Sequence, residues 1–260
     1  MSTAYRCNWE DSVTFPATRP RSRRNCPMAS ISDVAALTVA ESTTERSTFE
    51  RSEEPVNMVT HGLGLLLSVA GSAWLVSTAW DAGGVTRGVG CTVYAASLVA
   101  VYLFSTLSHT FETGEARQKF RALDQAFIYF LIVGTYTPVA LAYLQGGLYT
   151  LLLASMWGVA IFGFLSKTVW RHRINSISTV SYLILGWMPV FSIPAAWLNM
   201  PSAAIALFVS GGLAYTLGVA FLINDKRVPY FHAVWHLLVM VGSACHFAAI
   251  LNHVATPVVG

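Results

Sequence analysis

Long apolar runs separated by short polar breaks dominate the chain after residue 55. We predict that these runs are helices at residues 56–80, 87–111, 122–143, 147–166, 177–198, 203–223 and 230–251. Each run is close to the roughly 20 apolar residues that a helix needs to cross a bilayer. None of them alternates between apolar and polar residues with a period of two, which argues against a β-barrel. The pattern therefore predicts an all-α integral membrane protein, a bundle of seven transmembrane helices.

Residues 1–53 differ in composition from everything that follows. They are rich in Ser, Thr, Arg and Glu and have no sustained apolar period, so we predict a disordered tail. The basic cluster at residues 19–24 is either a solvated part of this tail, a contact for anionic lipid head groups or part of a targeting peptide. The predicted organisation is a tail over 1–53, a seven-helix domain over 54–253 and a short tail over 254–260.

The charge content supports lipid as the solvent. Only 11% of the residues are charged and 54% are hydrophobic, whereas soluble domains carry about 25% charged residues. The four cysteines show no metal-binding or redox spacing, and we predict that they form no disulfide framework. The composition predicts a multi-pass membrane location without specifying which membrane, and no nucleic-acid partner is expected.

The basic residues predict an orientation. Of the 16 Lys and Arg residues, all except Arg87 lie in the tail or in the breaks after the second, fourth and sixth runs. In a seven-helix chain these places are all on one side of the membrane, and an even number of helices would spoil the separation. The positive-inside rule then puts the N-terminus in the cytosol and the C-terminus outside.

Three histidines at predicted helix ends suggest a metal site. His232 and His236 are four residues apart, which places them on one helical face. His109 ends the second run, and Asp124 lies near the start of the third. The predicted topology brings all four to one depth in the inner half of the bilayer, where ionisable groups are costly and usually functional. Three imidazole nitrogens would hold Zn²⁺ and leave a fourth position for water.

Asp124 and Ser105 are the predicted catalytic residues. Asp124 could hold the metal-bound water and act as general base, or it could form an ion pair with a loop arginine such as Arg121. Ser105, four residues before His109, could orient Asp124, the water or a substrate carbonyl. Alternatively, its hydroxyl could bond to the carbonyl one turn earlier in its own helix.

Further polar residues stand at the same depth at the start of the first run. Glu54, Asn57, Thr60 and His61 could cap that helix or support the metal ligands through hydrogen bonds.

Four stretches that contain these residues resemble the hemolysin III family, within the progestin and adiponectin receptor superfamily. The resemblance covers about residues 54–253, and the order of the stretches matches. Ser108 and Gln125 depart from the pattern, because many relatives have an aromatic residue and a histidine there. The stretches are residues 57–64 (NMVTHGLG), 105–109 (STLSH), 123–138 (LDQAFIYFLIVGTYTP) and 232–236 (HAVWH).

The resemblance implies seven helices, a cytosolic N-terminus and zinc held by His109, His232 and His236, with Asp124 near the zinc-bound water and Ser105 close by. Alkaline ceramidases form a related group, so the resemblance also implies hydrolysis of an amide in a lipid.

Three functions follow as hypotheses. The first is a zinc-dependent hydrolase that acts on a membrane lipid with an amide or ester bond, such as a ceramide-like substrate. The second is a signalling receptor in which zinc only ties helices together. The third is a cytolysin, which the intramembrane charges do not support because they form a compact site rather than a polar stripe along a pore. The oligomeric state is left open.

Overall fold

The computed structural model describes residues 31–111, 113–144, 146–170 and 175–256. The side chains of residues 31–52 and 175–178 are outside this description. The chain divides into two units, Met1–Thr44 and Glu45–Gly260. In the first unit, residues 31–44 are helical. The second unit holds all of the membrane helices and is described below.

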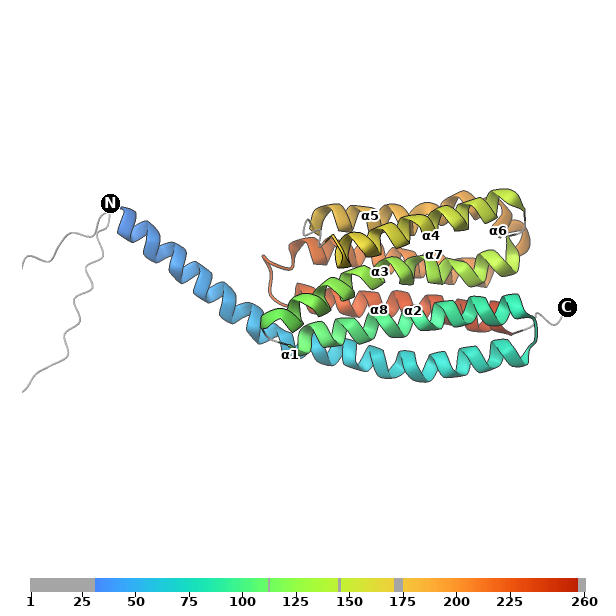
Figure 1. Cartoon of the computed structure of the whole chain (residues 1–260), viewed down its shortest axis with the longest axis horizontal. Helices are drawn as coiled ribbons and strands as arrows, with labels where there is room; N and C mark the ends of the chain where they lie inside the picture. The colour runs from blue at the N-terminus through green and yellow to red at the C-terminus, as the bar shows by residue number, and fades with distance from the viewer. Residues whose placement is uncertain (1–30, 112, 145, 171–174, 257–260) are drawn as a thin grey trace, which may run out of the picture. The chain divides into compact units, whose positions relative to one another are not determined.

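Helices account for all the regular structure in the described part of the chain (Figure 1). Two short segments depart from α-helical geometry: a 3-10 helix at Met188–Ser192 and a π-helix at Leu251–Ala255. The α-helices are α1 Ile31–Asp81, α2 Val85–Thr110, α3 Gly114–Tyr143, α4 Gly147–Thr168, α5 Asn175–Trp187, α6 Ile193–Asn199, α7 Ser202–Asn224 and α8 Phe231–Ile250.

Seven of the described helical segments are long and apolar enough to cross a membrane, which confirms the predicted bundle. The fifth segment, Thr179–Asn199, is composite, because α5 gives way to the 3-10 helix and then to α6. Pro189 and Pro194 lie in this region, and a proline removes a backbone donor and clashes with the preceding turn. The fifth span is therefore interrupted at these prolines. The cytosolic position of the N-terminus stays a prediction.

Two helices extend beyond the apolar runs that predicted them. α3 begins at Gly114 rather than at residue 122, and its first turns carry an ion pair of 2.9 Å between Lys119 and Glu115, a spacing that stabilises helices. α1 begins at Ile31, so residues 31–53 of the predicted tail are helical. That segment contains good helix formers such as Ala, Leu and Glu. Residues 1–30 and 257–260 of the two predicted tails lie outside the described residues.

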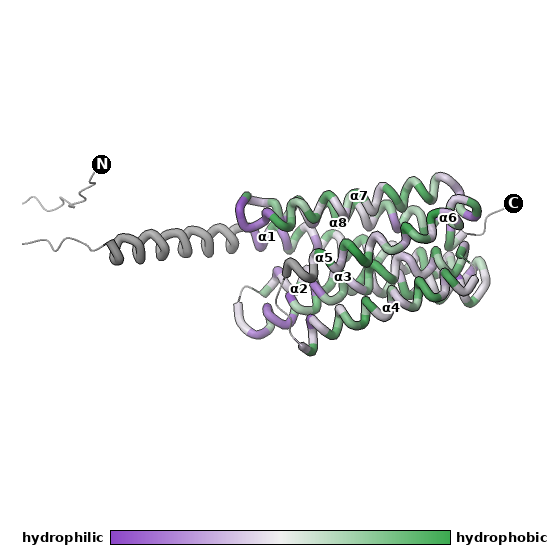
Figure 2. The backbone as a smooth tube through the Cα atoms, turned by 90° about the horizontal axis from the view of Figure 1, so that it is seen from above, coloured by the Kyte–Doolittle hydropathy of each residue, from purple (hydrophilic) through white to green (hydrophobic). Residues whose placement is uncertain are grey.

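The helices of the second unit run alternately up and down, so the end of α2 meets the starts of α3 and α8 (Figure 1). We call this end of the bundle the polar end, because hydrophilic residues gather there, as Figure 2 shows. α3, α2 and α8 are also the most enclosed spans, with 61%, 56% and 44% of their apolar windows buried, against 11% to 28% for the others. The helices predicted to carry the site are therefore those best shielded from lipid.

Candidate metal centre

Three histidines converge at the polar end of the bundle. His109 in the last turn of α2 and His232 and His236 in the first turns of α8 offer ligand atoms that all lie within 4.8 Å of one another. Tetrahedral coordination with bonds of about 2.0–2.1 Å requires ligand atoms about 3.3 Å apart. A small contraction would therefore seat one ion, and the structure brings together the three residues that the sequence predicts.

Carboxylates hold two of these imidazole rings. His109 Nδ1 lies 2.5 Å from Glu54 Oε2 on α1, and His232 Nδ1 lies 2.9 Å from Asp225 Oδ2, directly after α7. An imidazole that donates its Nδ1–H to a carboxylate presents Nε2 as a metal ligand, which is the usual support for a metal-bound histidine. Glu54, which the sequence predicts as a supporting residue, has this geometry with His109. Asp225 has the same geometry with His232.

The third ring, that of His236, is 1% exposed and is held by α1. Its Nδ1 lies 3.2 Å from the Oγ1 of Thr60, and its ring stacks on that of His61 with 3.5 Å between ring centroids. The buried Nε2 of His109 has no hydrogen-bond partner in the described part of the chain. A buried nitrogen with an unused lone pair is costly, and a metal ion would satisfy it. The residues therefore fit the implied zinc ion.

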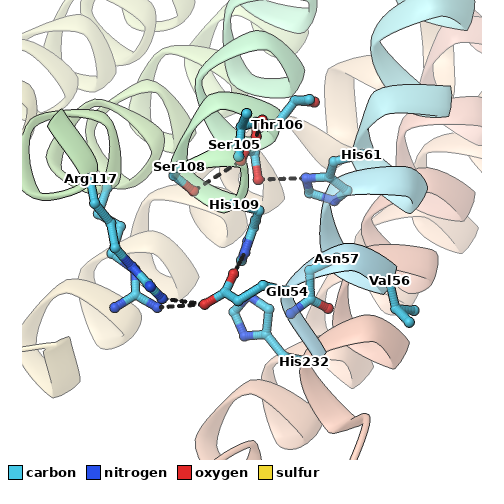
Figure 3. A network of polar contacts seen from close by, with 12 residues as sticks. Glu54, Val56, Asn57, His61, Ser105, Thr106, Ser108, His109, Arg117 and His232 are labelled. Atoms are coloured by element: carbon cyan, nitrogen blue, oxygen red, sulfur yellow. Dashed lines mark hydrogen bonds and ion pairs between the residues drawn. The ribbon is translucent and has the colours of Figure 1, made fainter. Parts of the chain in front are cut away.

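Glu54 also pairs with the start of α3, as Figure 3 shows. Its Oε1 accepts a hydrogen bond from Arg117 and lies 3.9 Å from Arg121. Arg121, the residue suggested as an ion-pair partner of Asp124, thus pairs with Glu54 and also acts electrostatically on Asp124. One carboxylate of α1 joins α2 and α3 at the edge of the metal centre.

The proposed catalytic residues lie next to the histidines. Ser105 is 2% exposed, and its Oγ lies 2.6 Å from His61 Nδ1 (Figure 3). Asp124 lies close enough to His109 and Ser105 to interact with both electrostatically. Ser108 donates a long hydrogen bond of 3.5 Å to Asp124. Ser105 therefore contacts His61 across the helix interface, a contact that the sequence did not specify.

Asn57 helps to hold the histidines only indirectly. Its backbone carbonyl accepts a hydrogen bond of 2.9 Å from Thr60, the residue that holds His236. Its side chain is buried, and Oδ1 has no partner in the described part of the chain. Asn57 therefore acts on the centre through its backbone.

The start of α8 is fixed from α1. Glu53 Oε1 accepts a hydrogen bond of 2.5 Å from the backbone N–H of Tyr230, the residue directly before α8. Tyr230 has a φ of 59°, the left-handed region that side chains rarely adopt. Glu53 therefore stabilises an unfavourable backbone conformation two residues before His232.

Sequence reasoning missed three residues of this arrangement: Glu53, Arg117 and Asp225. Thr60, which the sequence predicts among the supporting residues, contacts His236, and Glu53 stands beside the predicted Glu54. Asp225 could have been identified from the sequence, because it is an acidic residue in the break just before a histidine pair.

Two cavities lie elsewhere in the bundle. One of about 270 Å³ lies between the end of α3 and the start of α4, away from the polar end, and is lined by residues such as Leu144 and Tyr149. The other, of about 240 Å³, lies between α2, α3 and α4 and is lined by residues such as Phe130 and Trp157. Neither is lined by the three histidines.

Comparison with known proteins places the chain in a family. The model of the family described as "Haemolysin-III related" matches residues 49–247. The chain is 38% identical to "Hemolysin-3" of Bacillus cereus over 202 residues, which cover 78% of this chain and 92% of the relative. It is 34% identical to the "Hemolysin-3 homolog" of Bacillus subtilis (strain 168) over 203 residues, 78% of this chain and 95% of the relative.

A more distant similarity extends to animals. The chain is 26% identical to the human "Monocyte to macrophage differentiation factor" over 215 residues, 77% of this chain and 84% of the relative. No solved structure matches the chain. The family match runs from α1 into the last turns of α8 and so covers most of the seven-helix bundle. This multi-pass membrane protein therefore belongs to the haemolysin-III-related family.

Proposed function

We propose that this protein is a zinc-dependent hydrolase that cleaves an amide or ester bond of a membrane lipid at the polar end of the bundle. One observation carries the proposal: three histidine ligand atoms lie within 4.8 Å of one another, beside a buried serine and an aspartate. Three nitrogen ligands with an open fourth position are typical of catalytic zinc.

The donor set supports zinc over harder cations. Calcium and magnesium take oxygen ligands, whereas imidazole suits zinc and related transition metals. A zinc ion bound here would lower the pKa of its water to about 7 and so supply a hydroxide near neutral pH.

The chain's own residues would supply the other steps. The carboxylate of Asp124 would accept the proton of the attacking water and return it to the leaving amine or alcohol. The Ser105 hydroxyl, held by His61, would orient Asp124 or donate a hydrogen bond to the substrate carbonyl oxygen. Since these groups lie within membrane-spanning helices, a lipid whose cleavable bond lies near the head group fits the site, as in a ceramide-like amide.

Asp124→Asn tests the hydrolase directly. The variant should keep its zinc, because Asp124 is not among the three ligands, and should hydrolyse lipid amides or esters about 10²–10⁴-fold more slowly, the usual contribution of a general base. Lipid products would be measured by mass spectrometry, with zinc content measured on the same samples. Asp81→Asn is the matched control, because Asp81 is an exposed carboxylate at the other end of α1.

The outcomes separate the candidate functions. Equal hydrolysis by Asp124→Asn and wild type would remove Asp124 as the base. Bound zinc without lipid hydrolysis in the wild type would favour the receptor with a structural zinc. Dye release from liposomes by zinc-free protein would favour the cytolysin that the name of the bacterial relative suggests.

A further inference from the structure

We propose that Asp225 is a positioning residue of the metal centre, which holds His232 in the orientation that binds the ion. This inference rests on the zinc site of the proposed function but not on catalysis. Asp225 directly follows α7, and its Oδ2 lies 2.9 Å from His232 Nδ1. Because Nδ1 is engaged by Asp225, Nε2 of His232 would be the atom that binds the ion.

The three histidines differ in how firmly the bundle holds them. The side chain of His109 is only 3% exposed and contacts Glu54, while His236 is buried beneath His61. The side chain of His232 is 23% exposed, so packing restricts its ring less than the other two. Its orientation therefore depends most on its carboxylate partner.

The backbone around Asp225 is organised to present this carboxylate. A turn follows α7, in which Arg227 and Val228 both donate backbone hydrogen bonds to the Asn224 carbonyl, at 2.9 and 3.2 Å. At the other end of the connection, Glu53 accepts the N–H of Tyr230. The connection between α7 and α8 is thus fixed at both ends, and Asp225 is held within hydrogen-bonding distance of a ring seven residues further along the chain.

The charge of Asp225, like its position, favours binding of the metal ion by His232. Asp225 is followed by Lys226 and Arg227, both exposed, yet its carboxylate pairs with the imidazole. A carboxylate hydrogen-bonded to a ligand ring increases the basicity of that ring and favours the bound cation. Removing Asp225 should therefore weaken zinc binding through both lost orientation and lost charge.

The test is the zinc dissociation constant of the full-length protein in detergent, measured by competition with a chromophoric chelator. Asp225→Ala should bind zinc about 10–100-fold more weakly than wild type, the usual cost of losing such a partner. Asp225→Asn keeps an oxygen that can accept the Nδ1–H and loses only the charge, so its affinity should lie between the two. Lys226→Ala, the neighbouring exposed residue, is the matched control and should match wild type.

A parallel melting curve of the zinc-free proteins separates positioning from stability. If Asp225 only stabilised the connection, Asp225→Ala would melt at a lower temperature without a change in zinc affinity, and the inference would be overturned. Equal melting and equal affinity would overturn it as well. A wild-type protein that binds no zinc would overturn both the inference and the proposed function, whereas zinc binding without lipid hydrolysis would overturn only the hydrolase.

Discussion

Two buried polar clusters share the interface between α2 and α8, and they have different chemistry. The metal centre lies at the polar end. Two helical turns further along, the hydroxyl cluster consists of Tyr102 on α2, Tyr215 on α7 and Ser243 on α8. Tyr102 donates a hydrogen bond of 2.9 Å to Ser243 Oγ, which lies 2.8 Å from the Tyr215 hydroxyl. Ser243 follows His236 by seven residues, about 10 Å along the helix.

The two clusters use their polar atoms differently. In the hydroxyl cluster, the three hydroxyls satisfy one another, as buried polar groups normally do. In the metal centre, carboxylates and a hydroxyl take the Nδ1 side of each ring, and the Nε2 of His109 has no protein partner among the described residues. The metal centre thus keeps a buried nitrogen that a ligand could use, whereas the hydroxyl cluster uses its polar atoms to join helices.

The largest effect should come from removing a metal ligand. His236→Ala should lower zinc affinity by more than about 100-fold, since the loss of a mere supporting partner already costs about 10–100-fold. Ser243→Ala, on the same face of the same helix, should bind zinc like wild type. Zinc would be quantified by mass spectrometry of purified protein after dialysis. Similar zinc content in both variants would remove the distinction between the clusters.

Ser243→Ala should instead act on stability. The substitution leaves the hydroxyls of Tyr102 and Tyr215 without their shared partner, and buried hydrogen bonds of this kind contribute about 1–2 kcal/mol. Thermal unfolding followed by circular dichroism in detergent would measure the loss. Ser77→Ala, at an exposed position on α1, provides a control that should unfold like wild type. A loss of zinc from Ser243→Ala would show that the hydroxyl cluster belongs to the metal centre.

The smallest effect is expected where α8, which carries residues of both clusters, begins. Tyr230→Gly should stabilise the protein by about 0.5–1 kcal/mol, because relief of the left-handed conformation exceeds the entropic cost of glycine. Both clusters should be unaffected, so zinc affinity should not change. A destabilised variant in the same unfolding assay would mean that contacts of the half-exposed Tyr230 side chain outweigh its backbone conformation.

Much of this arrangement could be predicted from the sequence. The apolar runs predict the spans because lipid leaves the backbone few alternatives to helix. The alternation of direction between spans then brings His109, His232 and His236 together, since residues at helix ends on one side must share a depth. The four-residue spacing of the α8 pair fixes their common face.

The remaining contacts could not be predicted because they depend on which helices are neighbours. Thr60 reaches His236, and Arg117 reaches Glu54, only because α1 lies against α8 and near the start of α3. Periodicity along one helix contains no information about such pairs. The contact of Asp225 with His232 depends on the path of the connection between α7 and α8, which hydropathy does not determine.

The support that α1 gives to the metal centre has a consequence for biosynthesis. α1 is the first of the seven spans to leave the ribosome and α8 the last, yet Glu54 and Thr60 of α1 hold rings on α2 and α8. A nascent chain can therefore assemble the ligand set only after its last span has been inserted and has packed against the first. Acquisition of the metal would then mark the completion of folding in the membrane.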